Sequence, residues 1–236
     1  MAQLPNASIS LRALARLLSY PDAELLGHLS DMRAALQSDR TVSPARLVEL
    51  NALMATLERG DPLDNEAEYV AMFDRGRATS LHLFEHVHGD SRDRGPAMID
   101  LAQTFEKAGL FLAPGEMPDY LPAVLEFVST QPPREARAFL AEMAHIFNAI
   151  FNALQQRESP YASVLGALLE LAGETAHAVR VTPDEPIDTA WEEPVVFDGC
   201  SSKGQSKPGQ AQPIHFVKHD AARASAPATE NQGAAP

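Results

Sequence analysis

The sequence has almost no cysteine and too few positive charges to balance its acidic residues, and each shortage excludes a class of protein. Cys200 is the only cysteine among the 236 residues, which excludes an intramolecular disulfide framework and a cysteine-ligated metal centre built within one chain. The sequence has 19 Lys and Arg residues against 32 Asp and Glu residues, which gives a net charge of −13. This balance disfavours non-specific attraction to nucleic acid or to an anionic membrane and favours a basic partner segment.

The sequence also lacks a long apolar run. Its most apolar stretch, residues 144–154, is interrupted by His145, Asn148 and Asn152, and it falls well short of the roughly 20 residues that a membrane-spanning helix needs. The first residues show no positive cluster followed by an apolar core, so no secretory signal is expected. We therefore predict a cytoplasmic protein without stable membrane insertion.

What the sequence does contain is apolar residues at helical spacing along most of its first 180 positions. Three amphipathic stretches fall at 11–18, 25–36 and 47–57. Ser43 and Pro44 are typical of the start of the third helix, and Gly60 is typical of its end. Further patterns lie at 66–73, 98–105, 121–128, 133–154 and 161–172, and the last two are expected to be the central helices. Because no stretch alternates with period two, the sequence predicts an all-α, single-domain bundle of about eight to ten helices.

The composition changes after residue 180 and divides the chain into three parts. Residues 1–180 form the predicted helical domain. Residues 181–200 are acidic around Trp191, whose ring we expect to dock on the bundle, because an exposed ring of that size forfeits burial energy. Residues 201–236 contain too few large apolar side chains to offset the entropy of ordering them, so a disordered tail is predicted.

The densest group of chemically active side chains lies in residues 73–95, which hold three of the eight histidines. We expect a helix that begins near Thr79 and places His82 and His86 on one face, four residues apart. Neutral imidazoles at that spacing can ligate zinc, iron or haem. The order does not match a His-Glu-x-x-His zinc hydrolase, however, and no third ligand follows at a recognised spacing. The favoured interpretation is that the rings form hydrogen bonds across helix contacts, with Glu85 stabilising the charged imidazole.

Arginines and aspartates alternate in the same region, which predicts bidentate ion pairs that organise the loops. The arginines are Arg75, Arg77, Arg92 and Arg94, and the aspartates are Asp74, Asp90 and Asp93. The sequence has no phosphate-binding glycine loop and no nucleophile elbow, and a lone Cys200 in the tail is a poor nucleophile. The chain is therefore expected to be no enzyme and to carry no cofactor of its own.

A second motif, residues 114–122, forms a stiff acidic loop between two helical patterns. Its carboxylates can accept hydrogen bonds from a basic peptide, while its methionine and tyrosine offer adaptable apolar contact. An ordinary helix connection with Asp119 as the N-terminal cap is an equally weighted alternative. The predicted peptide groove combines this loop with two apolar anchors and comprises Tyr69, Phe73, Glu116, Met117, Asp119 and Tyr120.

Four runs carry a resemblance to a known family. They are Tyr-Val-Ala-Met-Phe-Asp-Arg-Gly-Arg at 69–77, Ser-Leu-His-Leu-Phe-Glu-His-Val-His-Gly at 80–89, Ser-Arg-Asp-Arg-Gly at 91–95 and Glu-Met-Pro-Asp-Tyr-Leu-Pro at 116–122. The chain resembles the nitrate reductase molybdenum cofactor assembly chaperones, the delta-subunit or NarJ type of redox-enzyme maturation chaperone, from about residue 11 to about residue 194. The wider group's Glu-Pro-x-Asp-His signature is altered here, since proline is displaced and tyrosine replaces histidine, which argues against general binding of twin-arginine signals.

The resemblance implies an all-α chaperone that binds the catalytic alpha subunit of respiratory nitrate reductase, mainly its N-terminal segment and as the alpha–beta complex. It implies that the chaperone holds this enzyme competent for molybdenum cofactor insertion until the complex docks on its membrane anchor. The runs also mark residues for recognition or structure: Asp74, Arg75, Arg77, His82, Glu85, His86, His88, Arg92 and Arg94. Two alternatives remain, a helical metal or haem protein using His82 and His86, and a helical adaptor without a client enzyme.

Overall fold

The computed structural model of the protein describes residues 6–89 and 91–179. Over these ranges the chain forms ten α-helices, one short 3-10 helix and no strand. The prediction of an all-α fold with about eight to ten helices is therefore confirmed for this part of the chain. The acidic segment around Trp191 and the predicted disordered tail lie outside the described residues.

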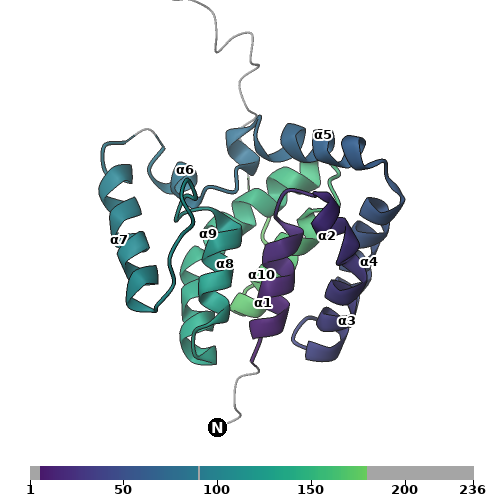
Figure 1. Ribbon diagram of the computed structural model, residues 1–236, viewed down its shortest axis with the longest axis horizontal. Helices are drawn as coiled ribbons and strands as arrows, with labels where there is room; N and C mark the ends of the chain where they lie inside the picture. The colour runs from purple at the N-terminus through teal and green to yellow at the C-terminus, as the bar shows by residue number, and fades with distance from the viewer. Residues whose placement is uncertain (1–5, 90, 180–236) are drawn as a thin grey trace, which may run out of the picture. The chain divides into compact units, whose positions relative to one another are not determined.

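The helices follow one another with short connections (Figure 1). In chain order they are α1 (Ser8–Leu17), α2 (Ala23–Gly27), α3 (Leu29–Asp39), α4 (Pro44–Arg59), α5 (Pro62–Phe73), the 3-10 helix η1 (Arg77–Thr79), α6 (Leu83–Val87), α7 (Arg94–Lys107), α8 (Leu121–Ser129), α9 (Pro133–Gln156) and α10 (Ala162–Ala172). None of the described helices is long and apolar enough to cross a membrane.

Local sequence signals set several of these helix ends. The Ser43 side chain accepts a hydrogen bond from the Arg46 N–H at 3.2 Å, and Pro44 occupies the first helical position of α4. Gly60 follows the last residue of α4, as the sequence predicts. Asp61 caps the start of α5 in the same way, because its carboxylate accepts the Leu63 N–H at 2.9 Å. Each cap satisfies an amide that has no partner within its own helix.

The prediction of a single helix over residues 25–36 is wrong. The chain forms α2 and α3 there, separated at His28, whose N–H bonds to the Leu25 carbonyl three residues back at 3.0 Å. Leu25 and Leu29 are both buried on the two sides of this break. The apolar spacing is therefore preserved across the break, and periodicity alone could not reveal it.

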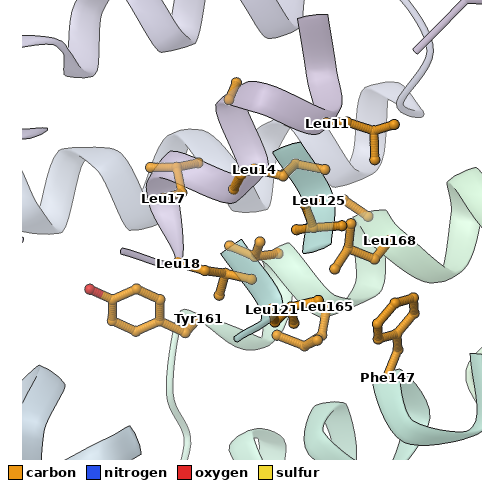
Figure 2. Close-up of a cluster of buried hydrophobic side chains, with 14 of the residues drawn as sticks. Leu11, Leu14, Leu17, Leu18, Leu121, Leu125, Phe147, Tyr161, Leu165 and Leu168 are labelled. Carbon is orange, nitrogen blue, oxygen red and sulfur yellow. The ribbon is translucent and has the colours of Figure 1, made fainter. Parts of the chain in front are cut away.

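The core is built around α10, which is apolar on every side. All of its residues from 162 to 169 are buried, which is the pattern of a helix enclosed by others. It packs along α9, and α1 packs on α8 beside them (Figure 1). Figure 2 shows Leu14, Leu125 and Leu165 in one cluster of buried side chains. The prediction of two central helices is confirmed for α10, whereas α9 keeps one face exposed.

Two asparagines that interrupt the apolar pattern of α9 have a structural role. The side chain of Asn148 both donates to the His177 carbonyl, at 3.0 Å, and accepts the His177 N–H, at 2.9 Å. Asn152 donates to the same carbonyl at 2.9 Å. The segment that follows α10 is therefore fastened to α9, and the polar residues pair with backbone groups that would otherwise lose hydrogen bonds.

Replacing Phe147, a fully buried residue of α9, by alanine is expected to lower the free energy of unfolding by about 3–5 kcal/mol, because a cavity forms in the core. Urea denaturation followed by circular dichroism measures this loss. Val48→Ala on α4 is the control, since that side chain is 69% exposed. A loss at Phe147 no larger than the loss at Val48 would contradict this description of the core.

Candidate functional site

An open, polar cavity of about 370 Å³ lies where α5 ends and α6 begins. The loop after α5 supplies most of its wall, and residues around α6 supply the rest. Its lining residues are Phe73, Asp74, Arg75, Gly76, Arg77, Ser80, His82 and Glu85. The structure thus brings much of the charged run noted in the sequence to one surface.

Asp119, which lies in the loop before α8, connects this loop with the start of α6 beside the cavity. Its side chain is 0% exposed. One carboxylate oxygen, Oδ2, accepts the backbone N–H of Phe84 at 3.2 Å, and Oδ1 lies 3.2 Å from Nδ1 of His82. The Phe84 N–H belongs to the first turn of α6, where amides have no partner within the helix. Asp119 therefore caps a helix that lies far from it in sequence.

Backbone hydrogen bonds join the same two segments. The Leu83 N–H donates to the Asp119 carbonyl at 3.0 Å, and the Leu121 N–H donates to the Leu81 carbonyl at 2.8 Å. Between them, His82 and Tyr120 form an isolated antiparallel bridge. The start of α6 and the start of α8 are consequently held in register by backbone as well as side-chain bonds.

Arg94, at the first position of α7, supplies positive charge to this junction. Its Nη2 lies 3.5 Å from Glu85 Oε1 and 3.8 Å from Asp119 Oδ2. A buried carboxylate without a counter-charge is strongly destabilising, so Arg94 and His82 together compensate Asp119. The predicted pairing of the arginines with neighbouring aspartates is wrong for Arg94. Asp93 instead accepts a hydrogen bond from the Ser91 hydroxyl at 3.2 Å, and residue 90 lies outside the described ranges.

His82 is a titratable group on the cavity wall. Its hydrogen bond with Asp119, together with the negative charges of Asp119 and Glu85, raises the pKa of His82 above its ordinary value of 6.5. Partial burial and the charge of Arg94 act in the opposite direction but do not prevail. The ring also packs on Tyr120, with ring centroids 5.5 Å apart. The charged imidazole is therefore favoured next to the cavity.

Tyr69 and Phe73, the predicted apolar anchors, are buried under the site. Each is 4% exposed, and their ring centroids lie 4.8 Å apart. The Tyr69 hydroxyl donates to the Leu18 carbonyl at 2.7 Å and lies 3.0 Å from the Tyr120 hydroxyl. Burial raises the pKa of Tyr69. Phe73 contributes to the cavity wall, whereas Tyr69 supports Tyr120 from within.

The loop before α8 divides the remaining predicted groove residues between surface and interior. Met117 is 42% exposed. Glu116 is also exposed, and its Oε2 accepts the Ala113 N–H at 2.8 Å. Asp119 is enclosed, so its carboxylate acts inside the protein. The alternative expectation that Asp119 caps the helix it precedes is wrong, because α8 begins after Tyr120 without a side-chain cap.

The prediction that a helix begins near Thr79 is also wrong. Thr79 ends η1, its hydroxyl donates to the Met72 carbonyl, and α6 begins only at Leu83. His82 therefore precedes the helix and turns toward Asp119, while His86 Nε2 lies 2.8 Å from the Ser80 carbonyl oxygen. The two imidazoles engage separate partners. Across the described residues, no group of three or more His, Cys, Asp or Glu side chains could hold a metal ion.

Of the other residues marked by the sequence, Asp74, Arg75 and Arg77 line the cavity, whereas His88 and Arg92 are not among its lining residues. Asp74 follows the last residue of α5, and Arg75, like Asp74, is exposed. Arg77 is exposed in η1, and Arg92 is exposed before α7. His88 follows the last residue of α6, with its ring edge-on to a phenylalanine of that helix, at 5.3 Å. The cavity wall thus carries charges of both signs.

Sequence reasoning missed Arg157, which supports the back of the site. Its Nη1 donates to the Met72 carbonyl at 3.4 Å and to the Thr79 hydroxyl at 3.3 Å. Because Met72 is 85 residues away in sequence, no local pattern could have indicated this contact. Tyr161 was expected only as an apolar position of a helix, yet its ring packs on Phe73 at 5.1 Å.

Comparison with known proteins places these residues in a family context. A family model described as nitrate reductase delta subunit matches residues 38–166, which include the whole cavity wall. The chain is 42% identical over 195 residues to the nitrate reductase molybdenum cofactor assembly chaperone NarJ of Escherichia coli K12, covering 78% of this chain and 83% of that protein. It is 37% identical over 153 residues to the nitrate reductase-like protein NarX of Mycobacterium tuberculosis, covering 64% of this chain and 22% of that one.

A solved structure supports the fold. The crystal structure of an Archaeoglobus fulgidus protein described as a redox enzyme maturation protein superposes with a TM-score of 0.50 at 21% identity. The match covers 71% of this chain and 94% of that one. At this identity the likeness concerns the fold alone.

The His82 ring is expected to titrate above 6.5, and Asp119→Asn should lower its pKa, because the hydrogen-bonded charge is removed. A raised pKa in the folded state stabilises the protein below the unfolded value and loses that effect as pH rises through the folded value. The free energy of unfolding should therefore be higher for the parent than for His82→Gln, and this difference should be larger at about pH 6 than at about pH 8. NMR titration and urea denaturation measure both effects, and an equal difference at the two pH values would contradict the pairing.

Proposed function

The chain belongs to the nitrate reductase delta subunit family, and we propose that it binds the catalytic alpha subunit of respiratory nitrate reductase as an assembly chaperone. The observation that carries the proposal is the 42% identity to NarJ over 195 residues. That relative is by name a chaperone for molybdenum cofactor assembly and not an enzyme. This chain holds its client in a form that can accept the cofactor, and it contributes no catalytic group of its own.

The client contact falls mainly on the N-terminal segment of the alpha subunit, within the alpha–beta complex. Support comes from charge and from shape. The chain carries a net charge of −13, which attracts a basic segment. The cavity between α5 and α6 presents Asp74 and Glu85 beside Arg75 and Arg77, Tyr120 packs on the His82 ring of its wall, and Met117 is exposed in the loop before α8. An extended or helical peptide can use such a combination of anchors and charges.

The place of action follows from the client. Cofactor insertion precedes docking of the complex on its membrane anchor, so the chaperone acts in the cytoplasm and leaves before the enzyme is finished. A metal or haem function at His82 and His86 has no comparable support, because the two rings engage separate partners and no group of three ligating side chains occurs among the described residues.

Deleting the gene is expected to leave the alpha subunit without molybdenum, and supplying the full chain should restore both molybdenum content and nitrate reductase activity. The alpha–beta complex should co-purify with the tagged chaperone from cells grown anaerobically with nitrate. Glu85→Lys is expected to weaken capture, because it reverses a charge on the cavity wall. The control is Glu135→Lys, an exposed carboxylate in the first turn of α9.

Two results would contradict the proposal. One is a fully loaded alpha subunit in cells that lack the chaperone. The other is the absence of alpha subunit from the purified chaperone in cells whose enzyme lacks cofactor. Molybdenum analysis of the purified enzyme and immunodetection of the alpha subunit distinguish these outcomes from simple loss of expression.

A further inference from the structure

A second cavity, of about 400 Å³, lies between α4, α5 and the connection from α9 to α10. Its apolar wall includes Leu53, Leu57 and Met72, and the Tyr161 side chain also lines it. Met72 is adjacent in sequence to Phe73, which lines the first cavity. The two cavities share no lining residue, but both reach the end of α5.

The Tyr161 hydroxyl is the feature that indicates a ligand. The residue is only 7% exposed, and within the described ranges this oxygen is the one buried side-chain polar atom without a hydrogen-bond partner. Figure 2 shows the hydroxyl turned away from the leucine cluster on which its ring packs. Burial raises the pKa of Tyr161, so the hydroxyl is neutral and can donate or accept a hydrogen bond. A buried polar group of this kind usually has a partner.

The rim of this cavity is negative. Glu68 and Glu158 line it and are both exposed, and neither forms a salt bridge in the part of the chain that the structure describes. After burial, the negative charge of Glu68 also raises the pKa of Tyr161. Arg157 also lines the cavity and holds one positive charge against the Met72 carbonyl and Thr79, which the two carboxylates outnumber. The two carboxylates therefore favour a cation at the mouth.

These features select among ligand classes. An anion would be repelled by the two rim carboxylates, and a purely apolar group would leave the Tyr161 hydroxyl unpaired. A long side chain with an apolar stem and a cationic end satisfies both requirements, because its methylene groups can cover Leu57 and Met72 while its N–H groups reach polar partners. Arginine and lysine are the side chains with this construction.

We propose that the cavity lined by Leu57, Met72 and Tyr161 binds an arginine or lysine side chain of the client's N-terminal segment. This inference rests on the proposed function, since it names the group on the client that the chaperone recognises. The cationic end donates a hydrogen bond to the Tyr161 hydroxyl oxygen and pairs with Glu68 at the rim. The aliphatic stem lies against the apolar wall.

The test is a calorimetric titration of the full chain with a synthetic peptide of the alpha subunit's N-terminal segment. A matched set of peptides replaces each arginine by citrulline and each lysine by norleucine, one at a time. The chaperone variants are Glu68→Gln and Tyr161→Phe, which keep side-chain size. The controls are Asp64→Asn, another exposed carboxylate of α5, and Tyr20→Phe, whose hydroxyl bonds to Glu66 outside the cavity.

Glu68→Gln is expected to weaken peptide binding roughly tenfold, and Tyr161→Phe several-fold, because each removes a partner of the cation. One peptide substitution should lower the affinity for the parent chaperone as much as Glu68→Gln does. The same peptide should lose little further affinity for Glu68→Gln, which is the signature of a direct pair. The methyl resonance of Met72 should shift when the native peptide binds. It should stay in place when no peptide is added, and also when the added peptide lacks that basic residue. Circular dichroism of each variant verifies folding.

Equal affinity of the parent, Glu68→Gln and Tyr161→Phe for every peptide would overturn this inference and leave the proposed function intact. A peptide without any arginine or lysine that binds as tightly as the native one would also overturn it. If the parent binds no peptide and captures no alpha subunit from cells, the proposed function fails, and this inference fails with it.

Discussion

The structure of the candidate site depends on one buried carboxylate, that of Asp119. It lies in the short loop before α8, yet it accepts the Phe84 N–H at the start of α6 and pairs with His82 and Arg94. The group is costly to bury unless all of these partners are in place. The positions of α6, the start of α7 and the start of α8 are therefore linked, and this linkage holds His82 and Glu85 on the wall of the cavity.

This linkage explains why the sequence assigned a wrong structural role to some residues of this region. Apolar periodicity predicted the helices and the enclosed α10, because burial of an apolar face is a local, repeating requirement. It could not show that the chain breaks at His28, since the spacing continues through the break. Nor could it show that Asp119 caps α6 and not its own helix, because that bond joins residues that are distant in sequence. Long-range pairing, as with Arg157 and Met72, is not encoded in any local pattern.

The family motifs thus combine two kinds of residue. Tyr69, Asp119 and Arg94 hold the junction together, and other residues such as Arg75 and Arg77 are exposed. Placing the recognition surface on loops fixed by a helical core is a common arrangement for binding proteins, since the core supplies rigidity and the loops supply chemistry. Side chains that are held in place before a ligand arrives limit the entropy lost on binding.

Hydrogen exchange at single residues in the parent and in Asp119→Asn tests the role of the buried carboxylate most directly. The account predicts faster exchange of the Phe84 amide and of its neighbours in α6 in the variant, because the cap loses its charge and α6 opens locally. Amides in α10, which is enclosed by other helices, should exchange as in the parent. Unchanged exchange throughout α6 would show that Asp119 does not hold this helix in place, and would contradict the account of the site.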